Sequence, residues 1–226
     1  MTTMYARRLS RESLLGTIPA REPGKPVLSD DEKTHSSICL PVRYCQPSHV
    51  CSRSCYACQG PIAWPGALTK ALAVDRLIVD EPEAAAERVL WESRGNPIRW
   101  AGSGDGAAHH LPFLRACRAR GIKLWGFTKI PAFWLASRES GYNFMYSLDE
   151  SMRGSPRWSW AMRHVARRWR TYLRRPKDPD RSRQVYVTFP EHGPQTPRVA
   201  SVPVSRTDCP AVRSHEPCGP CRLCKG

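Results

Sequence analysis

The sequence lacks any apolar run of the length that crosses a bilayer, about eighteen residues. Its start, residues 1–13, is basic and lacks the apolar centre of a secretory signal peptide. We therefore expect the protein to stay in the cytoplasm and to have no membrane partner. Because thiols stay reduced in that compartment, clustered cysteines there indicate metal ligation or catalysis rather than disulfides.

Acidic residues are scarce relative to basic ones, since 20 Asp and Glu face 35 Lys and Arg, and the net charge is +15. Residues 153–183 hold eleven Arg or Lys and two Asp, a net charge of +9. The pattern predicts a helix over residues 158–175, ended by Pro176. One interpretation is nucleic-acid binding, with arginines on phosphates and aromatic rings on bases, and the other is a solvated face. The arginines that would contact phosphates are Arg167, Arg168, Arg170 and Arg174.

The length of 226 residues and the hydrophobic content of 41% fit one domain with a hydrophobic core. Residues 1–37 show little periodicity, so we expect a mostly disordered or loosely attached basic arm. We expect an α/β domain over residues 38–208, which includes the basic helix, and a cysteine-rich tail over residues 209–226.

The middle of the chain alternates short apolar runs with helical patterns. The expected strands are residues 97–101, 122–127, 142–148 and 184–189, and the expected helices are residues 67–78, 81–91, 109–120 and 131–139. Strand, loop and helix repeated with short connections predict βαβ units and a parallel sheet, because a crossover helix is the usual way to join parallel neighbours. The sheet is expected to form part or all of a βα barrel.

Polar residues follow three of these strands, at the end where such folds place their chemistry. They are Gly102-Ser103-Gly104-Asp105, Thr128-Lys129 and Ser147 with Asp149. We take Asp105 and Lys129 as candidate catalytic residues, and residues 102–105 with Ser147 as candidate cofactor contacts. The alternatives are helix N-caps for Asp105 and Asp149, a solvated Lys129, and simple helix-start packing for His109-His110.

Nine of the ten cysteines fall in two groups, and the tenth, Cys117, lies in an apolar helical pattern typical of a core residue. The first group contains Cys51-x3-Cys55-x2-Cys58, with Cys39 and Cys45 nearby as alternative ligands, including for structural zinc. The second group is Cys209, Cys218, Cys221 and Cys224. Four thiolates so close together suit a closed zinc site or a four-cysteine [4Fe–4S] cluster, unless one of them completes the first site.

The C-x3-C-x2-C spacing, followed after the next strand by Gly102–Asp105, resembles the radical S-adenosylmethionine enzymes. The resemblance implies that Cys51, Cys55 and Cys58 bind three irons of a [4Fe–4S] cluster. It also implies that S-adenosylmethionine binds the fourth iron and contacts residues 102–105, which stand where that family has its Gly-Gly-Glu loop. An electron donor would then drive formation of a 5′-deoxyadenosyl radical, which acts on a substrate that the basic helix would guide if it is anionic.

A narrower resemblance joins several motifs in order. Cys45-x5-Cys51-x3-Cys55, then Gly104-Asp105, Thr128-Lys129, Ser147-x-Asp149 and the cysteines of the tail are similar to the phage "gene product 88" family. That resemblance implies a protein of the host cytoplasm and a ligand set of Cys45, Cys51 and Cys55. Two hypotheses follow. The first is an iron–sulfur enzyme. The second is a non-catalytic protein whose fold is stabilised by zinc or an iron–sulfur cluster and which binds nucleic acid or a host protein.

Overall fold

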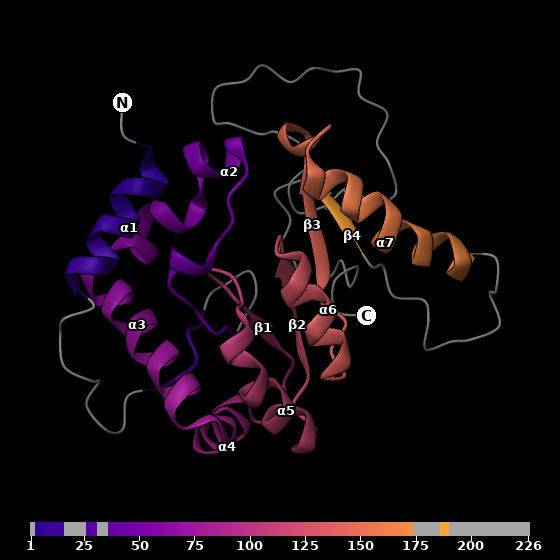
Figure 1. Cartoon of the computed structure of the whole chain (residues 1–226). Helices are drawn as coiled ribbons and strands as arrows, with labels where there is room; N and C mark the ends of the chain where they lie inside the picture. Colours follow the sequence, from indigo (N-terminus) through magenta and orange to yellow (C-terminus); the bar gives the residue numbers. More distant parts are fainter. Residues whose placement is uncertain (1–2, 16–25, 31–35, 174–185, 190–226) are drawn as a thin grey trace.

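The computed structural model describes residues 3–15, 26–30, 36–173 and 186–189 (Figure 1). A parallel sheet runs through the middle of the chain in the order β1-β2-β3-β4, as the α/β prediction requires. Its strands are β1 (Ile98–Trp100), β2 (Leu124–Thr128), β3 (Met145–Asp149) and β4 (Tyr186–Phe189). Strand and helix alternate along the chain, so the α/β fold class is confirmed.

The sheet is open rather than closed into a barrel. Within the described ranges β4 pairs with β3 but not with β1, so the expectation of a complete barrel is not met there. Beyond β1 the backbone of residues 36–40 adds a parallel neighbour, in which Ile38 N–H donates to Arg99 O at 2.9 Å and Gly102 N–H donates to Ile38 O at 2.8 Å. This segment, absent from the predicted strands, leads directly to the cysteines.

The helices follow the predicted ranges within a few residues. They are α3 (Pro65–Asp80), α4 (Pro82–Ser93), α5 (Leu111–Ala119), α6 (Pro131–Glu139) and α7 (Pro156–Leu173). The first four of these carry proline in the first turn, where its missing N–H costs nothing. Helices α5, α6 and α7 connect successive strands, and Figure 1 shows the sheet between α3 and α4 on the β1 side and α6 and α7 on the β3 side.

Aromatic side chains fill the core between β1 and its helices. Trp100 of β1 stacks on Phe133 with ring centroids 6.0 Å apart, and Phe133 stacks on Phe144 at the same separation. Cys117 is fully buried in this core, as predicted. A second apolar cluster, built from Trp134, Tyr146, Leu148, Met152, Ala161 and Val165, joins α6 and α7 to β3. No helix in the described part of the chain combines the length and the apolar character of a bilayer span.

Residues 4–15 differ from the expected loose arm, because they form helix α1 (Met4–Leu15) docked against the rest of the domain. Arg8 and Glu12 on this helix are buried as an i,i+4 ion pair, with Arg8 Nε 2.9 Å from Glu12 Oε1. Arg8 donates to the backbone carbonyls of Ala57 and Ile62, and Glu12 accepts from backbone N–H groups of residues 42–43. The helix is docked by charged side chains, which a reading of apolar periodicity does not detect.

Candidate metal centre

The first cysteine group lies in the cysteine loop, residues 42–63, which contains α2 (His49–Ser54) and the short helical turns η1 (Val42–Tyr44), η2 (Tyr56–Cys58) and η3 (Gly60–Ala63). Ser48 caps α2 by accepting a hydrogen bond from Cys51 N–H at 3.2 Å. Cys51 lies within the helix, and Cys55 ends it. Cys58 follows in η2, so that Cys51 and Cys58 each lie beside Cys55.

The thiols interact directly. Cys55 forms side-chain hydrogen bonds with both Cys51 and Cys58. Cys45 lies close enough to Cys51 and Cys55 for electrostatic interaction with them. None of the cysteines in the described part of the chain is in a disulfide. Cys39 lies apart from them on the segment beside β1, with its sulfur 3.9 Å from Ser37 Oγ.

The surroundings of the thiols differ in their effect on ionisation. The hydrogen bond from Cys55 lowers the pKa of Cys58, and the Arg8 guanidinium adds to that lowering. Burial raises the pKa of Cys45, and the Asp105 carboxylate adds to the rise. The pKa of Cys55 is also raised, because its bond to Cys58 and its burial outweigh the opposite effect of the bond from Cys51. Cys58 therefore becomes a thiolate more readily than Cys45 or Cys55.

The glycine loop, residues 102–105, packs closely on the segment that precedes the cysteines. Ser103 is fully buried and its hydroxyl donates to Leu40 O at 3.0 Å. Gly104 has φ +75°, and a Cβ there would lie 2.5 Å from the carbonyl oxygens of Leu40 and Pro41. Both features require glycine at this position. The predicted contact of residues 102–105 with a cofactor stays a prediction, since close packing already accounts for Gly104.

Asp105 fastens the glycine loop to the end of β2. Its carboxylate accepts from Gly106 N–H at 2.7 Å and from Lys129 N–H at 3.0 Å. Burial raises the pKa of Asp105 to about 6 against these hydrogen bonds. Asp105 is not a helix N-cap, because Ala107 holds that position in the next helical turn, η4 (Ala108–His110). Its place beside the cysteine loop is consistent with a role in the site.

Lys129 links the end of β2 to the cysteine loop. Its Nζ lies 3.3 Å from Ser48 Oγ, the cap of α2, and its carbonyl accepts from Tyr146 Oη at 3.0 Å. Ser147 is buried in β3 and pairs with Val187 of β4. The carboxyl ends of β1 and β2 therefore meet the cysteine loop, while Ser147 lies within the β3–β4 ladder and Asp149 at its end.

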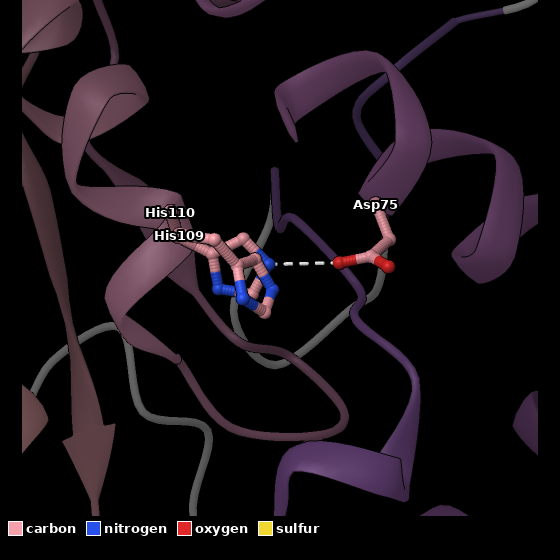
Figure 2. A group of neighbouring side chains, drawn as sticks. All are labelled: Asp75, His109 and His110. Atoms are coloured by element: carbon pink, nitrogen blue, oxygen red, sulfur yellow. Dashed lines mark hydrogen bonds and ion pairs between the residues drawn. The ribbon is translucent and has the colours of Figure 1, made fainter. Parts of the chain in front are cut away.

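A buried carboxylate that the motifs did not indicate organises the start of the cysteine loop. Asp75 of α3 accepts from Arg43 Nη2 at 2.5 Å and from Tyr44 Oη at 2.8 Å, and His110 Nε2 lies 2.8 Å from its other oxygen (Figure 2). His110 Nδ1 accepts from Ala107 N–H at 2.9 Å, so Nε2 carries the proton and donates to Asp75. Burial works to raise the pKa of Asp75, but these hydrogen bonds, led by that of His110, hold it below its ordinary value.

Asp75, His109 and His110 form the one group of metal-ligating type whose candidate atoms lie within 4.8 Å of one another in the described ranges (Figure 2). A cation there would compete with Arg43, which already contacts the carboxylate. Both ring nitrogens of His110 are also in use. The group is therefore a structural junction, and the helix-start packing expected for His110 is confirmed by its complete burial.

The remaining predicted site residues lie outside the described structure. They are the tail cysteines Cys209, Cys218, Cys221 and Cys224, together with Arg174 and the side chains of Arg167, Arg168 and Arg170.

Sequence reasoning missed Arg8, Glu12 and Asp75. Two signals were present: an Arg and a Glu at i,i+4 spacing, and an acidic residue in the middle of the apolar run of α3.

Comparisons of the chain with protein-family models, with curated proteins and with solved structures gave no match. The resemblances to radical S-adenosylmethionine enzymes and to the gene product 88 family therefore rest on the motifs alone.

Proposed function

We propose that this chain is an iron–sulfur protein of the radical S-adenosylmethionine type, with its cluster held by the cysteine loop. The observation that carries the proposal is the position of that loop. A segment parallel to β1 leads into it. The glycine loop, at the carboxyl end of β1, packs against that segment, and Lys129, at the carboxyl end of β2, contacts the cap of α2. Parallel α/β folds place their chemistry at that end of the sheet.

The donor set suits the cofactor. Soft thiolates favour iron–sulfur clusters and zinc, and three of them leave one iron open. In the proposal Cys51, Cys55 and Cys58 hold the cluster, since they are the three thiols joined by hydrogen bonds. When bound, such a cluster supplies one electron for the reductive cleavage of S-adenosylmethionine to methionine and a 5′-deoxyadenosyl radical.

The protein's own polar groups shape the space around the thiols. Asp105 holds the glycine loop and the end of β2 together, and Lys129 places its ammonium group at the cap of α2. A cation at that position favours an anionic group, such as the carboxylate of a bound amino acid. The tail cysteines would bind a second cluster or zinc, and a reducing protein partner would supply the electron.

The test is anaerobic purification followed by reconstitution with iron and sulfide. We expect a brown protein with the broad visible absorption of thiolate-bound clusters, and 5′-deoxyadenosine when S-adenosylmethionine and a strong reductant are added. In a chain whose four tail cysteines are replaced by Ser, the variant Cys51→Ser with Cys55→Ser should lose both signals, whereas Cys39→Ser, which changes a thiol outside the set, should keep both. A colourless protein with stoichiometric zinc and no iron would sink the proposal.

A second candidate function is nucleic-acid binding through the basic helix. The observation in its favour is that α7 begins at the cysteine loop, where Arg157 donates to the carbonyls of Gln46 and Pro47. If Arg167, Arg168, Arg170 and Arg174 contact phosphates, replacing all four with Gln should weaken binding equally across sequences and flatten its salt dependence. An unchanged salt slope, or no binding by the parent protein at low salt, contradicts this function.

A further inference from the structure

Helix α1 contributes a cation to the cysteine loop that no motif indicated. The Arg8 guanidinium is 3% exposed and forms its hydrogen bonds through Nε to Glu12 and through Nη1 to the carbonyls of Ala57 and Ile62. Ala57 directly precedes Cys58, so Arg8 bonds to the backbone next to one of the proposed ligands. The guanidinium therefore lies next to Cys58, the last of the three proposed ligands.

One nitrogen of this guanidinium has no partner. Arg8 Nη2 is buried and makes no hydrogen bond with any described residue. An unsatisfied donor on a buried charged group costs on the order of 1–3 kcal/mol, so native proteins seldom retain one without a ligand. Nη1 already donates to the carbonyls of Ala57 and Ile62, and Ala57 directly precedes the Cys58 thiol.

We propose that Arg8 is a positioning residue of the metal centre, which donates its Nη2 hydrogen bond to a metal-bound sulfur and so makes α1 part of the site. The inference rests on the proposed function for the identity of the centre. Hydrogen bonds and positive charge at sulfur stabilise the reduced, more negative form of an iron–sulfur cluster and raise its potential. Glu12, bonded to the same guanidinium, opposes that effect.

The test measures the midpoint potential of the reconstituted protein by anaerobic redox titration, in a chain whose four tail cysteines are replaced by Ser. Arg8→Gln should shift the equilibrium between oxidised and reduced forms at least tenfold toward the oxidised form, a fall of 59 mV for one electron. Arg7→Gln, which removes the same charge from an exposed position on the same helix, should leave the potential unchanged.

Glu12→Gln supplies a result of opposite sign, because removing the carboxylate should raise the potential. If Arg8→Gln lowers the thermal midpoint but leaves the potential equal to that of Arg7→Gln, the role of Arg8 is structural only and the inference is overturned. Should Arg8→Gln fail to fold or to hold iron, Glu12→Gln decides: a rise supports the inference, and no change refutes it.

Failure of the proposed function is recognised by the metal that the parent protein binds. A parent protein that binds zinc and no iron refutes the iron–sulfur proposal, and the Arg8 inference is then tested with Co²⁺ in place of zinc. Loss of a hydrogen bond to a metal-bound thiolate makes the sulfur a stronger electron donor, so Arg8→Gln should move the sulfur-to-cobalt absorption band to longer wavelength. The same band in both Arg8→Gln and Arg7→Gln would overturn the inference.

Discussion

The cysteine loop is held in two contrasting ways at its two ends. The first arm, residues 42–45, is held by side chains from two helices. Glu12 accepts from two backbone N–H groups, Tyr5 donates to two carbonyls, and Asp75 binds the side chains of residues 43 and 44. In the second arm, residues 55–62, a single cation, Arg8, binds two carbonyls and keeps a spare donor. We therefore expect the contacts of the first arm to stabilise the fold, and the contact of the second arm with Arg8 to affect the properties of a bound metal. In this sense the first arm is called the anchor.

The sharpest test of this contrast compares one cysteine from each arm. In a background without the tail cysteines, Cys58→Ser should lose most of the bound iron, because two thiolates hold a cluster poorly, and Cys45→Ser should keep it. The bonds that Cys55 makes with Cys51 and Cys58 and the lowered pKa of Cys58 favour this set. Iron and sulfide analysis of the purified variants measures the outcome.

The reverse result would select Cys45, Cys51 and Cys55, the set implied by the gene product 88 resemblance. Full iron in both variants would show that neither set binds the cluster, and the radical-enzyme proposal would lose its main support.

Removing the Asp75 contacts of the first arm should lower the free energy of unfolding and leave metal binding in place. Asp75→Asn removes the charge that Arg43, Tyr44 and His110 share, and loss of one partner from a buried charged network costs about 3 kcal/mol. Urea unfolding of the metal-free protein at neutral pH measures the change. Asp80→Asn, on an exposed position of the same helix, should stay within about 0.5 kcal/mol. An equal, small effect of both variants would refute the anchor.

The pH dependence of stability tests the buried carboxyl group beside the first arm. Because burial raises the pKa of Asp105 to about 6, the folded state holds its proton more tightly than the unfolded state does. The resulting stabilisation is complete below about pH 4 and is lost as the pH rises through about 6. The unfolding free energy of the parent minus that of Asp105→Asn should therefore fall by roughly 2.4 kcal/mol between pH 4 and pH 7. A difference that stays constant with pH would contradict the raised pKa.

The smallest expected effect concerns the hydroxyl that joins α1 to the first arm. Tyr5 Oη lies 3.0 Å from Val42 O and 3.2 Å from Cys45 O, so Tyr5→Phe should cost about 1 kcal/mol. Ser10→Ala, which removes an exposed hydroxyl bonded within α1, is the control and should be nearly neutral. Urea unfolding of the two variants and of the parent measures both changes in the free energy of unfolding. If Tyr5→Phe lowers the free energy of unfolding no more than Ser10→Ala does, the Tyr5 hydrogen bonds do not help to hold α1 on the first arm.

Local patterns were enough to predict the helices and strands of the middle of the chain. The helix at residues 131–139 and the strand following it were expected because apolar spacing and a first-turn proline act through neighbouring residues. The additional parallel segment at residues 36–40 was missed, because its partner in the ladder, Arg99, is about sixty residues away and its own sequence is short and interrupted by Cys39.

The cysteine spacing predicted that Cys51, Cys55 and Cys58 lie near one another, and Cys55 does contact both of the others. Cys51 lies in α2, Cys55 ends that helix and Cys58 lies in the next short turn, so local geometry brings Cys51 and Cys58 each beside Cys55. Binding of a cluster by these three thiols stays a prediction. Tertiary structure decided what surrounds them. Arg8 and Glu12 reach the loop from α1 and pair its backbone groups, and Asp75 reaches it from α3 and binds side chains of the loop. Buried polar and charged groups need such partners, and these partners come together only once the chain has folded.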